Sequence, residues 1–272
     1  MIDAFEQLME LQESEIRLDC AALHLARDAY PDLDLHRHLS RLDALADMVS
    51  ERRPGIGAVA RFEAMRDVLV GEENFTGNTQ DYFDPQNSYL NRVLDRRVGI
   101  PISLSVIWTE VGRRLKWPVA GVGFPGHFLV RFDDPDCFVL ADPFRDGMTL
   151  SLEDCKERLS NQGIDESCFQ MSMLEGIHTR AILSRMLKNL RTIFEHDEDY
   201  ARLARVLRRL MMVEPEESRH VQDLAELLCK MGHVGMAYYS LAGFLQQRPD
   251  CEDSTNIEKS MQRMRAMMTS RN

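Results

Sequence analysis

A histidine and an aspartate occupy two short segments that alternate between apolar and polar residues, "HFLVRF" and "CFVLAD". The "DDPD" between them is typical of the loop of a β-hairpin. A four-residue loop pairs Phe132 with Cys137. The same register places His127 directly opposite Asp142, with Cβ atoms about 5 Å apart and within reach of a carboxylate to imidazole hydrogen bond. The alternative is a structural histidine and a turn-forming aspartate before Pro143.

The period of two also assigns each side chain of the hairpin to a face. One face is wholly apolar and consists of Phe128, Val130, Phe132, Cys137, Val139 and Ala141. The other face consists of His127, Leu129, Arg131, Phe138, Leu140 and Asp142. The two residues that could do chemistry therefore share the second face.

The start of a helix precedes these strands, in "RRVGIPISLSVIW". Gly99 permits a tight turn, and Pro101 suits the first helical position because its missing N–H would have no partner there anyway. A helix N-terminus is where many enzymes lower the pKa of a nucleophilic cysteine. In this chain the position holds a proline, and the helix is expected to end before Trp117.

Three other residues are weaker candidates for binding. Asn87, in "DPQNSYL", is expected to cap the next helix or to line the site. Met211 and Met236 belong to a methionine-rich region, which suits an adaptable binding groove or an ordinary core.

The sequence indicates no metal or cofactor. Its six cysteines include no C-x-x-C pair, and the pair His36 and His38 has no accompanying set of ligands at metal-binding spacing. We therefore expect reduced cysteines, no metal and no cofactor.

Composition indicates a soluble protein with one or two domains, because 272 residues with 44% hydrophobic content can bury a full core. The first twenty residues carry acids and no long apolar run, so we expect neither a signal peptide nor a membrane span, and a cytoplasmic location. The net charge is −11. Residues 176–272 hold 15 Lys and Arg against 13 Asp and Glu, so the acidity belongs to residues 1–175. That acidity disfavours nucleic acid as a partner.

The order of periodicities predicts an α+β fold. Apolar residues recur at the helical period from Phe5 to Ala29 and again up to about residue 70, before the strands. The C-terminal part repeats: "LRTIFEHDEDYARLARVLRRLMMVEP" aligns with "LAELLCKMGHVGMAYYSLAGFLQQRP" at an offset of 34 residues. This offset is the tetratricopeptide period, a helix-turn-helix unit. We expect N-terminal helices plus a helix packed on a small antiparallel sheet over residues 1–175, and an all-α repeat domain over residues 176–272.

The order of helix start, His strand and Asp strand is that of the papain-like transglutaminase core. The segments "NSYLNRVLDRRVGIPISLSVIWTEVGRRL", "GVGFPGHFLVRF" and "ADPF" resemble the bacterial SirB family, which joins a transglutaminase-like core to C-terminal tetratricopeptide repeats. The resemblance is strongest from about Asn74 to Phe144.

The resemblance implies that His127 and Asp142 match the histidine and aspartate of the catalytic triad. An ungapped alignment with the family core puts Pro101 at the position of the cysteine, and proline has no nucleophilic atom. Ser105 lies one helical turn deeper, about 5 to 6 Å from where the thiol belongs, and Ser103 points to roughly the opposite side.

Three functions follow from these expectations. The first is a pseudoenzyme, a transglutaminase-like protein without its thiol that binds or scaffolds a protein or peptide through its core and its repeats. The second is an acyl transferase or peptidase-type enzyme that uses Ser103 or Ser105 with His127 and Asp142. The third is an adaptor in which only the repeats bind.

Overall fold

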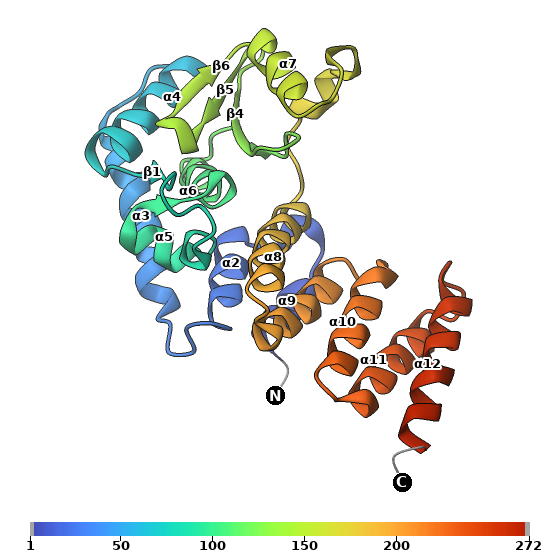
Figure 1. The fold of residues 1–272 in the computed structure, drawn as a ribbon. Helices are drawn as coiled ribbons and strands as arrows, with labels where there is room; N and C mark the ends of the chain where they lie inside the picture. Colours follow the sequence, from blue (N-terminus) through green and yellow to red (C-terminus); the bar gives the residue numbers. More distant parts are fainter. Residues whose placement is uncertain (1–2, 270–272) are drawn as a thin grey trace. The chain divides into compact units, whose positions relative to one another are not determined.

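The computed structural model describes residues 3–269, and the chain divides into two compact units at Met186 and Leu187 (Figure 1). Helix α8 (Thr179–His196) runs across this division. Within residues 3–269, no helix combines the length and the apolar character that crossing a membrane requires.

Helices build the N-terminal part of the first unit. They are α1 (Ala4–Met9), α2 (Leu18–Ala26), α3 (Leu35–Glu51), α4 (Ala58–Arg66) and α5 (Leu90–Arg96), with a π-helical turn, η2 (Asp67–Glu72), after α4. The helical period expected from Phe5 to Ala29 is interrupted by the 3-10 turn η1 (Glu13–Glu15). Glu15 accepts a hydrogen bond from the Gln12 backbone at this turn, so a polar side chain competes with the helix for backbone groups.

The four-stranded antiparallel sheet of this unit has the order β3-β4-β5-β6. Its strands are β3 (Val119–Val122), β4 (Leu129–Asp133), β5 (Phe138–Asp142) and β6 (Met148–Leu150). On one face, Phe132 packs against Trp108 of α6 (Pro101–Arg114) and Phe62 of α4, at ring distances of 6.1 and 5.9 Å. On the other face, Leu129 and Leu140 share a buried cluster with Cys155 and Leu159 of α7 (Leu152–Asn161). The sheet is therefore covered on both faces.

The observed hairpin register corrects the expected one. Val130 pairs with Ala141, and Asp133 pairs with Phe138, so the four-residue loop begins one residue later than expected. Asp133 stays in the strand because its N–H donates to the Pro118 carbonyl, 2.8 Å away. His127 consequently precedes β4 and is not opposite Asp142 in the ladder. The register shift is even, so each strand residue keeps its predicted face.

Short elements connect the helices to the sheet. β1 (Thr76–Gly77) and β2 (Val98–Gly99) form a parallel pair. A Cβ added at Gly77 would lie 2.4 Å from the Phe144 carbonyl oxygen, so only glycine fits this contact. The 3-10 turns are η3 (Pro85–Asn87), η4 (Pro143–Arg145), η5 (Glu166–Cys168) and η6 (Met171–Leu174).

The second unit consists of helices. Besides the end of α8, they are α9 (Tyr200–Val213), α10 (Ser218–Lys230), α11 (Val234–Gln247) and α12 (Ser254–Thr269). α9 packs on α10, α10 on α11 and α11 on α12. Both ends of α9 precede the corresponding ends of α11 by the 34-residue offset. The aligned residues Leu207 and Leu241 are each 1% exposed, so equivalent positions fill equivalent places in the core.

Candidate functional site

His127 and Asp142 lie side by side even though their backbones are not paired. The Nε2 atom of His127 is 2.8 Å from Oδ2 of Asp142. Asp142 is fully buried, whereas 16% of the His127 side chain is exposed. The contact is close but not aligned as a hydrogen bond, because no acceptor in residues 3–269 meets hydrogen-bond geometry at Nε2. The carboxylate of Asp142 is thus the group next to Nε2.

Asp142 is fixed by two further groups. Its Oδ1 accepts a hydrogen bond from the Phe144 N–H at 3.2 Å, where Asp142 caps the short helix η4. Its Oδ2 accepts one from Nη2 of Arg158, which α7 places 3.0 Å away. Burial acts to raise the pKa of Asp142, but the contacts with His127 and Arg158 outweigh it and hold the pKa below its ordinary value. Asp142 is therefore an ionised carboxylate.

A tight turn presents His127. Gly126 has a φ of +66°, and the His127 N–H donates to the Phe124 carbonyl at 3.1 Å. Arg185 of α8 donates from Nη2 to the carbonyls of His127, at 2.9 Å, and of Phe124, at 3.2 Å. Phe144 lies beside the imidazole, with ring centroids 6.3 Å apart. The backbone and the ring of His127 are both held in place.

Helix α6 begins at Pro101, which is buried at the first helical position as expected. Ser103 is fully buried and belongs to the helix start: its Oγ donates to the Asn87 carbonyl at 2.6 Å and accepts from the Ile100 N–H at 3.1 Å. Ser105 is also fully buried, and its Oγ has no partner among residues 3–269. The two serines thus differ: within residues 3–269 the Ser103 hydroxyl forms hydrogen bonds at the helix start, and the Ser105 hydroxyl forms none.

Asn87 organises the loop before α5. Its Nδ2 donates to the carbonyls of Asp81 and Tyr82, at 2.7 and 3.3 Å, and its Oδ1 accepts from Asn78 at 3.2 Å. The expectation that Asn87 caps the next helix is wrong, because the N-cap residue of α5 is Tyr89. Asn87 instead joins the loop to α6 through its own carbonyl.

The contacts described for His127 and Asp142 involve no cysteine or methionine of residues 3–269. Cys155 lies in the core on the α7 side of the sheet, and burial raises its pKa. Burial also raises the pKa of Cys20, to about 11. Within residues 3–269 no three His, Cys, Asp or Glu side chains gather as metal ligands would. Met236 of α11 is half exposed, and Met211 of α9 is partly buried.

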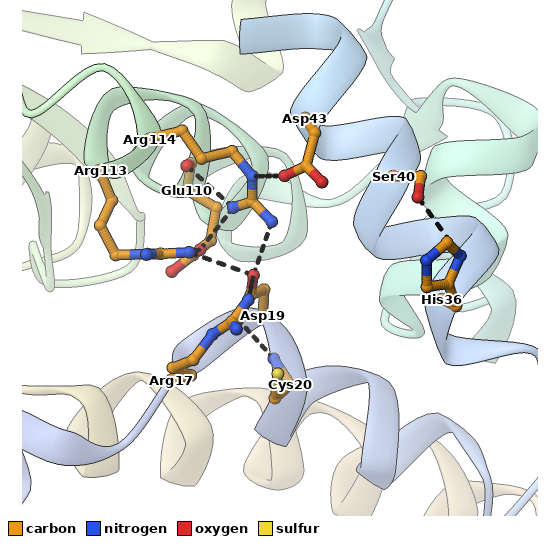
Figure 2. Close-up of polar contacts among 9 residues, drawn as sticks. All are labelled: Arg17, Asp19, Cys20, His36, Ser40, Asp43, Glu110, Arg113 and Arg114. Carbon is orange, nitrogen blue, oxygen red and sulfur yellow. Dashed lines mark hydrogen bonds and ion pairs between the residues drawn. The ribbon is translucent and has the colours of Figure 1, made fainter.

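A second buried carboxylate lies away from His127, at Asp19 of α2 (Figure 2). Its oxygens lie within 3.2 Å of the guanidinium groups of Arg17, Arg113 and Arg114. These contacts outweigh the effect of burial and hold the pKa of Asp19 well below its ordinary value. Glu110 of α6 contacts Arg113 and Arg114 as well, but burial and the Asp19 charge raise its pKa. This cluster joins α2 to the C-terminal end of α6.

Sequence reasoning did not single out Arg158, Phe144 or Arg185, although all three contact His127 or Asp142. The sequence signal that bears on Arg158 is the start of the helix that carries it. Ser151 and Asp154 form a capping box at the start of α7. Nothing in the sequence near Arg185 links it to His127, because the contact joins residues far apart in the chain.

Comparison with known proteins places this geometry in a family. The transglutaminase-like superfamily matches residues 36–188. A UPF0162 protein of Xylella fastidiosa is 33% identical over 92% of this chain and 90% of its own length, and one of Pseudomonas aeruginosa is 31% identical over 88% and 80%. Mouse F-box only protein 21 is 26% identical over 84% of this chain and 36% of its own length. No solved structure matches the chain. The matched residues include Pro101, His127 and Asp142 with the helix and strands that carry them, and the chain belongs to the transglutaminase-like superfamily.

Proposed function

We propose that this chain is a non-catalytic, SirB-type member of its superfamily that binds a protein segment at the His127 site, here defined as His127, Asp142, Phe144 and the start of α6. The observation that carries the proposal is Pro101 at the first position of α6, where the family resemblance places the nucleophilic cysteine. A proline supplies neither a thiol nor a backbone N–H for an oxyanion. The site would keep the positioned imidazole and carboxylate as a recognition surface in a cytoplasmic protein.

The alternative, an acyl transferase or peptidase that uses a serine, has less support. The Ser103 hydroxyl already contacts the Asn87 carbonyl and the Ile100 N–H. Ser105 has an unpartnered hydroxyl, but it is fully buried one turn along the helix from Pro101. Neither serine is available for attack without movement of α6.

The decisive experiment restores the missing thiol. If Pro101 stands at the nucleophile position, Pro101→Cys creates a thiol at a helix N-terminus beside His127, and both features lower a thiol pKa. We expect this cysteine to react with iodoacetamide at pH 6 at least tenfold faster than the matched control Ser105→Cys, measured by peptide mapping. Adding His127→Ala to the Pro101→Cys variant should slow the reaction of this thiol with iodoacetamide. A Pro101→Cys thiol no faster than the control would overturn the assignment of this position.

The wild-type chain is the second arm of that experiment. Incubated with an amine donor and a glutamine-containing acceptor, it should form no product above background, because no reactive thiol is positioned. A turnover that iodoacetamide abolishes would contradict the non-catalytic proposal. A turnover that iodoacetamide leaves intact and Ser105→Ala removes would favour the serine enzyme.

We further propose that the C-terminal helices are tetratricopeptide-like repeats that supply a second protein-binding surface. The 34-residue offset between α9 and α11 supports this, as do Met236 and Tyr239, which are 52% and 74% exposed on α11. Replacing both by serine should weaken capture of a partner, with the fold checked by circular dichroism. Unchanged capture would assign partner binding to the His127 site alone.

A further inference from the structure

Arg185 is bound to the backbone of the His127 site and to an aromatic ring. Its Nη2 donates to the carbonyls of Phe124 and His127. Its guanidinium also stacks over Phe128, with Cζ 5.3 Å from the ring centroid. These contacts fix the position of the guanidinium, but none of them carries negative charge.

The charge of Arg185 therefore lacks a counter-ion within residues 3–269, where it forms no ion pair. Burial lowers its pKa, and the Tyr82 phenol opposes that shift. Other half-buried arginines behave differently: acidic partners raise the pKa of Arg114, which contacts Asp19, and of Arg191, which contacts Asp223. A partly desolvated guanidinium without an acid is costly in a folded protein unless a ligand supplies the anion.

Tyr82 is a second donor in the surroundings of His127. Its ring packs edge-on against Phe144 at 5.9 Å, and Phe144 in turn contacts the His127 ring. Burial raises the pKa of Tyr82, and the Arg185 charge opposes that rise. The phenol is therefore a neutral donor. Its hydroxyl has no protein hydrogen-bond partner among the described residues. The neighbouring Phe83 is 65% exposed and packs on Tyr82 at 5.4 Å.

We propose that Arg185 and Tyr82 form a carboxylate-binding site beside His127, which takes an acidic side chain or the C-terminal carboxylate of a bound peptide. A guanidinium and a phenol match the two oxygens of a carboxylate, and the charge-assisted hydrogen bonds are the strong ones. Phe83 and Phe144 offer apolar contact to the adjoining residue of the peptide. This inference rests on the proposed function, since it names the chemistry of the segment bound at the His127 site.

The test compares three short peptides on the full chain by NMR titration. N-acetyl-Phe-Glu-amide carries a side-chain carboxylate, N-acetyl-Phe-Ala carries a terminal carboxylate, and N-acetyl-Phe-Gln-amide is the neutral analogue. At least one acidic peptide should bind tenfold or more tightly than the neutral one, and the stronger of the two identifies the source of the carboxylate. Equal binding of all three, or tighter binding of inorganic phosphate than of either acid, would overturn the proposal.

Variants of Arg185 and Tyr82 test whether these two residues cause the preference for acidic peptides. Arg185→Gln should remove the difference between acidic and neutral peptides. Because it also loosens the His127 loop, Tyr82→Phe is the second variant: it keeps the exposed ring, loses one donor and should weaken acidic binding about threefold. The matched control Arg61→Gln replaces an arginine that likewise donates to a backbone carbonyl, that of Asp133, and should leave all affinities unchanged. An acidic preference that survives both Arg185→Gln and Tyr82→Phe would contradict the proposal.

The outcome is separable from that of the proposed function. If the Pro101→Cys thiol proves unreactive while the acidic preference holds, the carboxylate site stands and the assignment of position 101 fails. If the reactive thiol appears but charge on the peptide has no effect, only the carboxylate site fails.

Discussion

Asp19 and Asp142 are both fully buried carboxylates whose pKa is held below its ordinary value, yet they serve different ends. Asp19 is surrounded by three arginines, which are permanently charged. Asp142 instead contacts one arginine, Arg158, and the imidazole of His127. A buried acid with a lowered pKa is thus no functional marker by itself. The groups beside the carboxylate distinguish the two sites: three arginines at Asp19, and Arg158 with the His127 ring at Asp142.

The largest effect is expected for Asp19→Asn. It leaves Arg114, whose side chain is only 10% exposed, with the exposed Asp43 and with Glu110 as its remaining acidic contacts. Removing one partner of a buried pair costs about 3–5 kcal/mol, and we expect that loss in the free energy of unfolding, measured by urea denaturation. Asp43→Asn is the matched control. Asp43 is 63% exposed and contacts the same arginine, so its loss should cost less than about 1 kcal/mol.

Asp142→Asn should cost less than Asp19→Asn. Asparagine retains the cap on the Phe144 N–H and loses the charge-assisted contacts with Arg158 and His127, for which a loss of about 2 kcal/mol is reasonable. The same urea experiment measures it, and NMR of His127 should report a changed ring environment. A loss in free energy of unfolding as large as that of Asp19→Asn would contradict this expectation. It would mean that the contacts of Asp142 stabilise the fold as much as the arginine cluster around Asp19 does.

The sequence was sufficient to predict the helix and strands that carry His127, Asp142 and Pro101, because each of these elements has a local signal. The proline and the preceding Gly99 mark the start of α6, and alternation marks β4 and β5. It was not sufficient for the hairpin register. The choice between Asp133 and Asp134 as the first loop residue depends on a bond to Pro118 of another segment.

The sequence could not predict what surrounds the two residues. Arg158 comes from α7 and Arg185 from α8, and periodicity gives no information on which helix end meets which loop. The contact between His127 and Asp142 was predicted, but through a β-ladder pairing that does not exist. It forms instead because the turn at Gly126 brings His127 back over the end of β5. The boundary between residues 175 and 176 and the roles of the site residues stay predictions.

The acid dependence of stability should distinguish Glu110 from the two aspartates. A depressed folded pKa means that Asp19 and Asp142 contribute stability that is fully present above the unfolded value and is lost as pH falls below about 4. Glu110 has a raised folded pKa, so its contribution is present at low pH and is lost as pH rises through that pKa.

The variant Glu110→Gln tests the direction in which the contribution of Glu110 to stability changes with pH. Relative to the wild type, the variant should gain about 1 kcal/mol in free energy of unfolding as pH is raised from 4 to 7. Urea midpoints at the two pH values measure the gain. The exposed Glu153→Gln, whose partner is Lys156 on the surface, should show no such trend. A trend of the opposite sign would mean that the arginines dominate at Glu110 as they do at Asp19.

The smallest effects are expected at the two serines, and they bear on whether the His127 site ever uses a hydroxyl. Ser103→Ala removes the hydrogen bonds that join α6 to the Asn87 carbonyl and the Ile100 N–H, so it should cost about 1 kcal/mol. Ser105→Ala removes a buried hydroxyl that has no partner in the described part of the chain, so stability should stay within about 0.5 kcal/mol or rise. Thermal and urea unfolding of both variants measure these changes in stability. A loss at Ser105→Ala as large as that at Ser103→Ala would mean that the Ser105 hydroxyl has a partner in solution, and only then would Ser105 regain weight as a candidate nucleophile.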